Sequence, residues 1–215
     1  MTTTKNPEIG PLLFDGPADA PVTVLLAHGA GAPMDSPFMT EIATGIAQHD
    51  WRVVRFEFPY MHRRRITGKK GGPGHATKLV GYYQSVIDHF GDVNRLVIGG
   101  KSMGGRIASM IADQSGVAGL MCFGFPFHPR GKPDRVRTAH LSNLKTPTLI
   151  VQGTRDPLGL PEEIETYTLA DTIEIVWAPD GDHSFKPRKS SGRTSHDNLT
   201  FTIQEANRFI DQLDI

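Results

Sequence analysis

The sequence predicts an α/β fold with a mainly parallel, twisted sheet and helices on both faces. Strand-like runs alternate with helix-like segments along the 215 residues, and several of these runs are nearly continuous Val, Ile and Leu. Continuous apolar strands indicate a sheet that is covered on both faces, and the alternation indicates βαβ units. Ligands of such sheets bind at the carboxyl ends of the strands, so we expect functional residues directly after strand ends.

The elements follow from local composition and periodicity. Strands are expected at 22–27, 52–58, 95–100, 117–123, 147–152 and 172–177, and residues 11–14 could add an edge strand. Helical spacing of apolar residues occurs at 38–48, 78–90, 105–113, 162–169 and 201–213. Segments 67–78 and 186–198 are polar or rich in Gly and indicate loops. Neither a repeat nor a domain boundary is evident, so residues 1–215 are predicted to form a single domain.

Charge and cysteine content narrow the classes of partner and compartment. Lys and Arg number 23, as do Asp and Glu, so no global charge favours nucleic acid or an anionic membrane. Cys122 is the only cysteine and lies in an apolar run, which indicates a buried thiol in a reducing compartment. The sequence shows neither a signal peptide nor an apolar run near the roughly 20 residues that span a bilayer. We expect a cytoplasmic protein with no membrane partner, and its oligomeric state stays open.

Gly100-Lys101-Ser102 permits two interpretations, a phosphate-binding P-loop or a nucleophile elbow. A P-loop requires glycine five positions before Gly100, where this chain has Arg95. Residues 96–98 are Leu-Val-Ile and still belong to a strand. No loop is therefore available to wrap a phosphate, and the P-loop is excluded.

The nucleophile elbow fits the same residues. Gly100, Ser102 and Gly104 form a G-x-S-x-G pattern between an expected strand and an expected helix. In such a turn the serine hydroxyl stands above the sheet, and small neighbours relieve steric strain. The amide of Met103, at the start of the helix, would then stabilise developing negative charge. The alternative is a glycine-rich turn with an unreactive serine.

A nucleophilic serine needs a base and an acid that orients it, and in this fold class they follow in the order Asp, then His. Asp156 comes just after the strand at 147–152, and His183 follows the strand at 172–177. Asp182 adjoins His183, but neighbouring side chains on an extended chain diverge, and Asp180 is a weaker alternative. We therefore assign Ser102 as nucleophile, His183 as base and Asp156 as orienting acid.

A loop of small residues follows the first core strand and could complete an oxyanion hole. His28-Gly29-Ala30-Gly31 can aim backbone amides inward, and we assign the amide of Ala30 to pair with that of Met103. His28 is expected to brace this loop rather than to catalyse. The assigned residues require neither a cofactor nor a metal.

The segments HGAGAPMDSPFM, GGKSMGGR, QGTRDPLG and DGDHSF together resemble the α/β-hydrolase superfamily over nearly the whole chain. They are similar in particular to dienelactone-hydrolase-like proteins. Within these they resemble the branch of testis-expressed hydrolase-like proteins and the regulatory subunit of a histone acetyltransferase (NSL) complex. The resemblance implies an α/β-hydrolase fold and cleavage of an ester, thioester or amide. Many members insert a lid after a late strand, but only residues 124–145 separate two strands here, so a minimal lid or none is expected.

Basic residues cluster where chain segments leave the expected carboxyl edge of the sheet. Arg63, Arg64 and Arg65 follow the second core strand, and further basic residues lie within 130–137 and 186–193. This pattern suggests a positive rim that attracts an anionic substrate, although three solvated loops would look the same. The candidates for substrate binding are Arg63, Arg64, Arg65 and His128. Lys101 could belong to this rim or form a buried ion pair.

These observations favour a serine hydrolase that cleaves a small ester or thioester through an acyl-enzyme intermediate. The partner expected is then a small-molecule acyl substrate, anionic if the rim functions. The alternative is a non-catalytic binding or scaffold protein on the same fold, which would have no need of the three assigned side chains. Acyl transfer on the same elbow is a third option.

Overall fold

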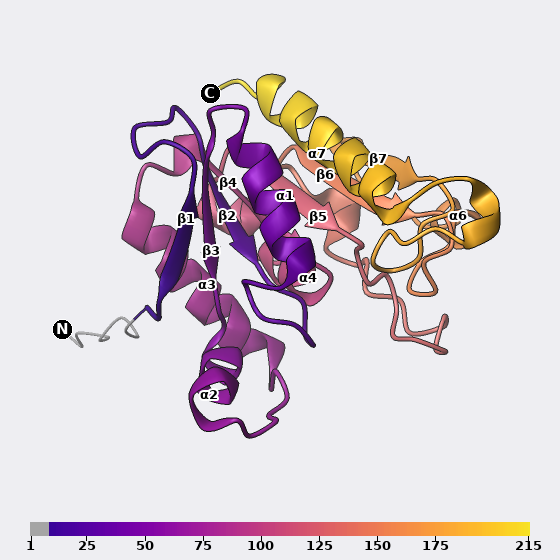
Figure 1. Ribbon diagram of the computed structural model, residues 1–215, viewed down its shortest axis with the longest axis horizontal. Helices are drawn as coiled ribbons and strands as arrows, with labels where there is room; N and C mark the ends of the chain where they lie inside the picture. Colours follow the sequence, from indigo (N-terminus) through magenta and orange to yellow (C-terminus); the bar gives the residue numbers. More distant parts are fainter. Residues whose placement is uncertain (1–8) are drawn as a thin grey trace.

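The computed structural model describes residues 9–215, which form a seven-stranded sheet in the order β1-β3-β2-β4-β5-β6-β7 (Figure 1). β1 runs antiparallel to β3, and the other neighbouring strands are parallel. The predicted sheet and its edge strand are therefore confirmed. The strands are β1 Leu12–Asp15, β2 Thr23–Ala27, β3 Arg52–Phe56, β4 Leu96–Lys101, β5 Gly119–Phe123, β6 Thr148–Gly153 and β7 Ile173–Ala178.

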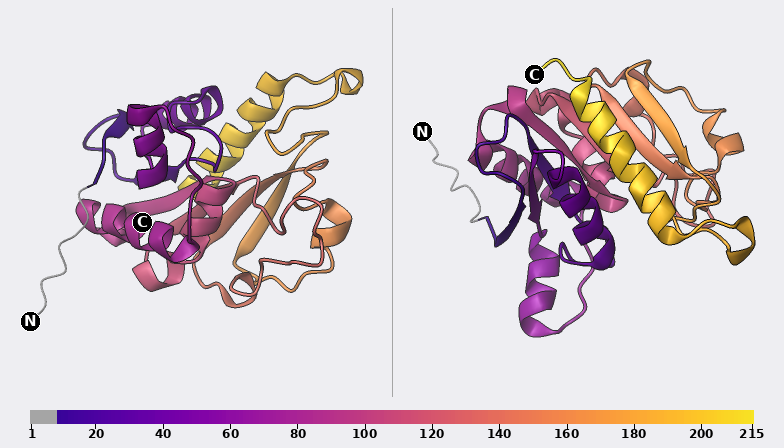
Figure 2. Two further views of the ribbon diagram at one scale, coloured as in Figure 1. Left: turned by 90° about the horizontal axis from the view of Figure 1, so that it is seen from below. Right: turned by 45° about the horizontal axis from the view of Figure 1, so that its top comes forward.

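Helices cover both faces of the sheet, because successive strand residues point to opposite sides. α1 (Pro37–Ala47) and α7 (Ser195–Asp211) pack on one face, while α3 (Ala76–Phe90) and α4 (Met103–Ser109) pack on the other (Figures 1 and 2). Leu25 joins the core beneath α3 and α4, whereas its neighbours Val24 and Leu26 join the core beneath α1 and α7. Among residues 9–215, no helix has the length and apolarity needed to cross a bilayer.

The last helix begins inside a segment that the sequence predicted to be a loop. A capping box starts α7: the hydroxyl of Thr194 accepts from the Asp197 amide, and the Asp197 carboxylate accepts from the Thr194 amide. This pair satisfies two backbone donors that a helix start leaves free. The loop prediction for 186–198 is therefore wrong at its end.

Helix α2 (Pro59–Thr67) was not predicted at all. Its sequence, PYMHRRRIT, carries too few apolar residues for a helical stripe, but its ends have standard helix signals. Pro59 occupies the first turn, and Gly68 ends the helix in the left-handed region at φ 69°. α2 lies below the labelled strands in Figure 1, directly after the end of β3.

Two further helices are shorter than predicted. The expected helix at 105–113 divides into α4 and α5 (Ala112–Ser115), because Ile111 leaves helical geometry at φ −125°. The expected helix at 162–169 is the single turn α6 (Pro161–Ile164). Between β5 and β6 the chain is irregular apart from one 3-10 turn, Leu141–Asn143, so no helical lid is inserted there.

The elbow requires glycine at position 104 because α4 approaches β2 closely. A Cβ atom on Gly104 would lie 2.4 Å from the Ala27 carbonyl oxygen and 2.8 Å from that of His28. Both neighbours are backbone atoms and cannot rotate away. We expect Gly104→Ala to lower the free energy of unfolding by about 1–3 kcal/mol in urea denaturation.

Gly81 in α3 provides the matched control for this substitution. A Cβ atom on Gly81 meets nothing within 4 Å, so Gly81→Ala should raise the free energy of unfolding by roughly 0.5–1 kcal/mol through helix propensity. Equal effects of the two substitutions would show that the close approach of α4 to β2 does not constrain the elbow.

Candidate active site

Ser102 sits in a sharp turn between β4 and α4. Its backbone adopts φ 50° and ψ −110°, a region that residues other than glycine rarely occupy. Its amide donates to the Phe123 carbonyl at 2.9 Å, and its carbonyl accepts the first helical bond from the Arg106 amide at 3.0 Å. Backbone strain of this kind costs on the order of 1–3 kcal/mol and is typical of functional turns. The structure therefore gives Ser102 the elbow geometry that the sequence predicted.

Ser102, His183 and Asp156 form a continuous hydrogen-bonded chain. The hydroxyl of Ser102 lies 2.9 Å from His183 Nε2, and His183 Nδ1 lies 2.7 Å from Asp156 Oδ2. Because a carboxylate can only accept, Nδ1 carries the proton and Nε2 is left to accept from the serine hydroxyl. The three residues follow β4, β6 and β7, so the sheet itself brings them together.

Asp156 is fully buried and held in place by further donors. The amide of Leu158 donates to Oδ1 at 2.9 Å, and Gln152 Nε2 donates to Oδ2 at 3.1 Å. Gln152 Nε2 also reaches the carbonyls of Phe125 and Gly159, which fixes its amide orientation. The sequence analysis missed Gln152, although its place at the end of β6, four residues before Asp156, was a usable signal.

The two alternative acids have other partners. Asp182 accepts from the backbone amides of Ser184 and Lys186 and thereby closes its own loop. Asp180 pairs with the guanidinium groups of Arg155 and Arg188. Neither carboxylate therefore replaces Asp156 beside His183.

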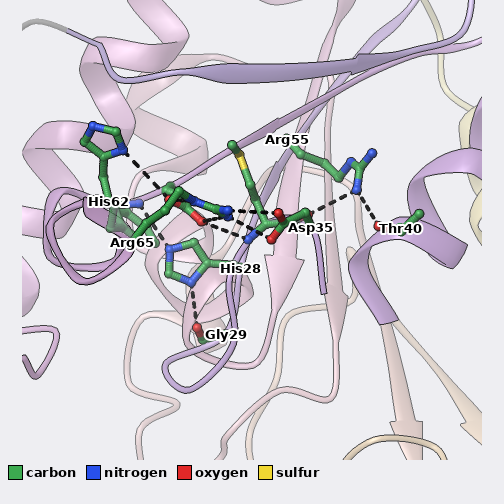
Figure 3. Close-up of polar contacts among 10 residues, drawn as sticks. His28, Gly29, Asp35, Thr40, Arg55, His62 and Arg65 are labelled. Atoms are coloured by element: carbon green, nitrogen blue, oxygen red, sulfur yellow. Dashed lines mark hydrogen bonds and ion pairs between the residues drawn. The ribbon is translucent and has the colours of Figure 1, made fainter. Parts of the chain in front are cut away.

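The loop after β2 is braced by the start of the α2 region. His28 is buried, donates from Nδ1 to the Gly29 carbonyl at 2.6 Å, and accepts at Nε2 from the Phe58 amide at 3.1 Å (Figure 3). Burial lowers the pKa of His28, so the ring stays neutral as these bonds require. The hydroxyl of Tyr60 donates to the Ala30 carbonyl at 2.9 Å. His28 is thus placed as a brace, as the sequence led us to expect.

Ala30 and Met103, the assigned oxyanion donors, both line a hollow of about 430 Å³ that also contains Ser102. Met103 is the first residue of α4, so its amide has no acceptor within the helix and lies at the positive end of the helix dipole. The arrangement suits stabilisation of an oxyanion on a substrate bound at Ser102. The role of the two amides in catalysis stays a prediction.

Arg65 is engaged in ion pairs away from the serine. Its guanidinium lies 2.6 Å from Glu57 Oε1 and 2.8 Å from Asp35 Oδ1 (Figure 3). Arg65 lowers the pKa of the Asp35 carboxyl through this hydrogen bond. The positive charge that the sequence assigned to substrate binding is therefore balanced by two carboxylates.

Arg63 and Arg64 also lie apart from Ser102. Arg64 donates to the Gly31 carbonyl at 3.3 Å, which adds a further brace to the loop after β2. Arg63 lines a separate hollow together with Ile66 and Tyr82. Within the described residues, the linings of the two hollows beside Ser102 do not include Arg63, Arg64 or Arg65. Their proposed contact with substrate thus finds no support in the geometry.

His128 does lie beside Ser102, the candidate nucleophile. It is 2 % exposed and lines the same hollow as Ser102. Its Nε2 pairs with Glu163 Oε2 at 3.2 Å, and its Nδ1 contacts the Pro129 carbonyl at 3.0 Å. The ring forms part of the wall with both nitrogens occupied, so it can contribute shape more readily than a new hydrogen bond.

Lys101, directly before Ser102 in the sequence, is buried and contacts His183. Its ammonium donates to the His183 carbonyl and lies 5.3 Å and 5.5 Å from the ring centres of Phe38 and Phe185. These aromatic faces favour a cation. Burial lowers the pKa of Lys101 to about 8, while Asp156 acts in the opposite direction. Within residues 9–215, Lys101 therefore forms no ion pair and lies apart from the exposed rim, and it holds the backbone of His183.

This burial predicts a dependence of stability on pH. Because the folded pKa of about 8 lies below the ordinary value of 10.5, the unfolded chain binds more protons than the native state between these pH values. As pH rises from 7 to 10.5, the free energy of unfolding of the wild-type protein should therefore increase by roughly 3 kcal/mol relative to that of Lys101→Met. Urea denaturation of both proteins across this range measures the difference, and a difference that does not change with pH would contradict the prediction.

Comparisons with known proteins agree with this architecture. A family model described as an alpha/beta hydrolase domain matches residues 20–211. A serine hydrolase without a lid from Xanthomonas campestris superposes with a TM-score of 0.70 at 22% identity, covering 98% of this chain and 93% of that chain.

Two further solved structures are similar over most of their lengths. An alpha-beta serine hydrolase homologue from Coxiella burnetii gives a TM-score of 0.69 at 20% identity, covering 92% of this chain and 89% of that chain. A dienelactone hydrolase from Anabaena variabilis gives a TM-score of 0.67 at 22% identity, covering 94% of this chain and 91% of that chain. These likenesses confirm the predicted fold, with no lid.

Proposed function

The chain belongs to the α/β-hydrolase domain family, and we propose that it is a serine hydrolase that cleaves a small ester or thioester. The observation that carries this proposal is the hydrogen-bonded chain from Ser102 through His183 to Asp156. A scaffold protein has no need of a strained serine joined to a base and a buried acid. The likeness to solved serine hydrolases supports the same class of reaction.

The proposed reaction passes through an acyl-enzyme. The Ser102 oxygen attacks the substrate carbonyl carbon as His183 Nε2 takes the hydroxyl proton. Asp156 stabilises the imidazolium, and the amides of Ala30 and Met103 bind the oxyanion. The bond to the leaving oxygen or sulfur then breaks, and the leaving group takes the proton from Nε2. Water, deprotonated by His183, attacks the acyl group and releases a carboxylic acid and free Ser102.

The site favours small substrates. The irregular β5–β6 connection provides no helical lid, and the hollow beside Ser102 holds about 430 Å³. Small-molecule sites commonly fall between about 300 and 1,000 Å³. On the basis of the motif resemblance, we further propose that the protein belongs to the branch of testis-expressed hydrolase-like proteins and the NSL-complex subunit. We also propose that it acts in the cytoplasm, because its single cysteine, Cys122, is a buried free thiol.

Pre-steady-state kinetics tests the proposal. A series of p-nitrophenyl esters and matched thioesters, from acetyl to octanoyl, should show turnover that declines once the acyl chain exceeds the hollow. A burst of p-nitrophenol equal to the enzyme concentration should appear with at least one ester, because acylation then precedes slower deacylation. Absence of turnover with every ester and thioester would favour the non-catalytic scaffold.

A further inference from the structure

The hollow beside Ser102 carries positive charge on its lining. Its apolar lining residues include Leu79, Ile107 and Leu158. Three arginines also line it: Arg106, Arg130 and Arg137. A hollow lined by both apolar side chains and arginines fits a short carbon chain with an anionic terminus.

Arg106 is the member of this set nearest to the nucleophile in sequence, one helical turn after Ser102 on α4. Its side-chain Nε is buried and has no hydrogen-bond partner among the described residues. Burial and the neighbouring charge of Arg137 lower the pKa of Arg106. A buried donor without a partner is costly, and a second cation beside it adds to that cost. An anion bound between them would remove both penalties.

The protein itself supplies no such anion. Within residues 9–215, no carboxylate oxygen lies within 4.0 Å of a guanidinium nitrogen of the three arginines. Glu163 pairs with His128 and accepts from the Leu160 amide. His140, also close to Arg106, bonds to the Ser109 hydroxyl and carries no negative charge. Asp134 belongs to the loop that carries Arg130 and Arg137, but it is exposed and forms no ion pair with the three arginines.

The two hollows beside Ser102 determine which part of the substrate meets the arginines. His183 lines the second hollow, of about 330 Å³, together with Ser184 and Phe38, whereas it is absent from the lining of the arginine hollow. His183 must give its proton to the leaving group. We therefore assign the leaving group to the second hollow, whose lining includes His183, and the acyl group to the first.

We propose that Arg106 and Arg137, with Arg130 at the rim, bind an anionic group at the far end of the acyl chain. The substrate class is then a half-ester or half-thioester of a dicarboxylic acid, or its phosphonate or phosphate counterpart. This inference rests on the proposed hydrolase activity and specifies its acyl preference. Arginine is suited to the role because its planar guanidinium binds carboxylate and phosphate groups through paired hydrogen bonds.

Matched substrates test the proposal. The probes are p-nitrophenyl hydrogen adipate, its neutral methyl ester, and the phosphonate analogue of the same chain length. We expect Arg106→Gln to lower kcat/KM for the carboxylate or phosphonate ester roughly 10- to 100-fold, since a hydrogen bond to a charged group is lost. Turnover of the neutral methyl ester should change less than about 3-fold. Arg135→Gln removes the same charge from an exposed position two residues before Arg137 and should leave all three substrates unaffected.

Equilibrium binding provides a readout independent of turnover. In a Ser102→Ala background, calorimetry should show that adipate or the matching phosphonate binds at least 10-fold more weakly after Arg106→Gln or Arg137→Gln. The two ligands distinguish a carboxylate site from a phosphate site. Folding of each variant is checked by urea denaturation. If Arg106→Gln does not fold, Arg137→Gln replaces it in both the kinetic and the binding experiment.

The outcomes separate this inference from the proposed function. If the neutral ester is hydrolysed but Arg106→Gln and Arg137→Gln change the anionic and neutral substrates equally, the anionic acyl site is refuted and the hydrolase stands. Unchanged affinity for both anions in the binding experiment refutes it likewise. If no ester is hydrolysed and no Ser102-dependent burst appears, the proposed function itself fails.

Discussion

Ser102→Ala should lower kcat by a factor on the order of 10⁴–10⁶ with any ester that the wild-type protein hydrolyses. The reason is that the substitution removes the hydroxyl oxygen that lies 2.9 Å from His183 Nε2 and that this nitrogen is positioned to activate. Binding and the assigned oxyanion amides remain, so KM should change far less than kcat. Steady-state kinetics with p-nitrophenyl esters measures both constants.

Ser142→Ala is the matched control for this substitution. Ser142 is half-buried in the connection between β5 and β6, where its hydroxyl donates to the Ala139 carbonyl at 3.0 Å and accepts from Asn143 Nδ2 at 3.2 Å. The kcat of Ser142→Ala should match that of the wild type. A Ser102→Ala protein that retained more than about a tenth of the wild-type kcat would show that another group performs the attack.

Asp156→Asn should lower kcat by about 10³–10⁴ because neither orientation of the new amide fits its surroundings. If the amide nitrogen replaces Oδ2, it faces the NH₂ group of Gln152, and His183 must carry its proton on Nε2 to offer Nδ1 as an acceptor. Nε2 then donates to Ser102 and cannot accept its proton. If the nitrogen replaces Oδ1, it opposes the amide of Leu158. Stopped-flow measurement of the acylation rate tests the prediction directly.

Asp180→Asn separates this effect from a general loss of negative charge. Asp180 lies on the same loop as His183 but pairs with Arg155 and Arg188. The kcat of Asp180→Asn should stay within about 3-fold of the wild-type value. If Asp180→Asn were as slow as Asp156→Asn, the orienting role assigned to Asp156 would be wrong.

The sequence was sufficient to predict the sheet and to bring the three candidate catalytic residues together. Apolar strands are marked by local composition, and the topology of a parallel sheet places the residues after β4, β6 and β7 at a common edge. The positions of Ser102, Asp156 and His183 therefore followed from spacing and order alone. The predicted brace at His28 also followed from its place directly after β2.

Features that depend on tertiary partners were beyond the sequence. The α2 helix has no apolar stripe, and its importance arises from the bonds of Tyr60 and Arg64 to the loop after β2. The charge of Arg65 suggested a free cation until the fold placed Glu57 and Asp35 beside it.

Conversely, nothing in local sequence distinguished Arg106 from any other helical arginine. Its significance comes from burial without a partner beside a second cation, Arg137, and both properties are set by packing. The same holds for Lys101, whose ammonium is enclosed by aromatic rings and by the loop that carries His183.

Covalent labelling with a fluorophosphonate tests the central claim most directly, because the reagent reacts preferentially with an activated serine. Intact-protein mass spectrometry at neutral pH should show a single phosphonyl adduct on the wild-type protein, and peptide mapping should place it on Ser102. Labelling should be absent in Ser102→Ala and at least 10³-fold slower in Asp156→Asn. No adduct on the wild-type protein, or equal labelling of Ser102→Ala, would contradict the assignment of Ser102 as a nucleophile.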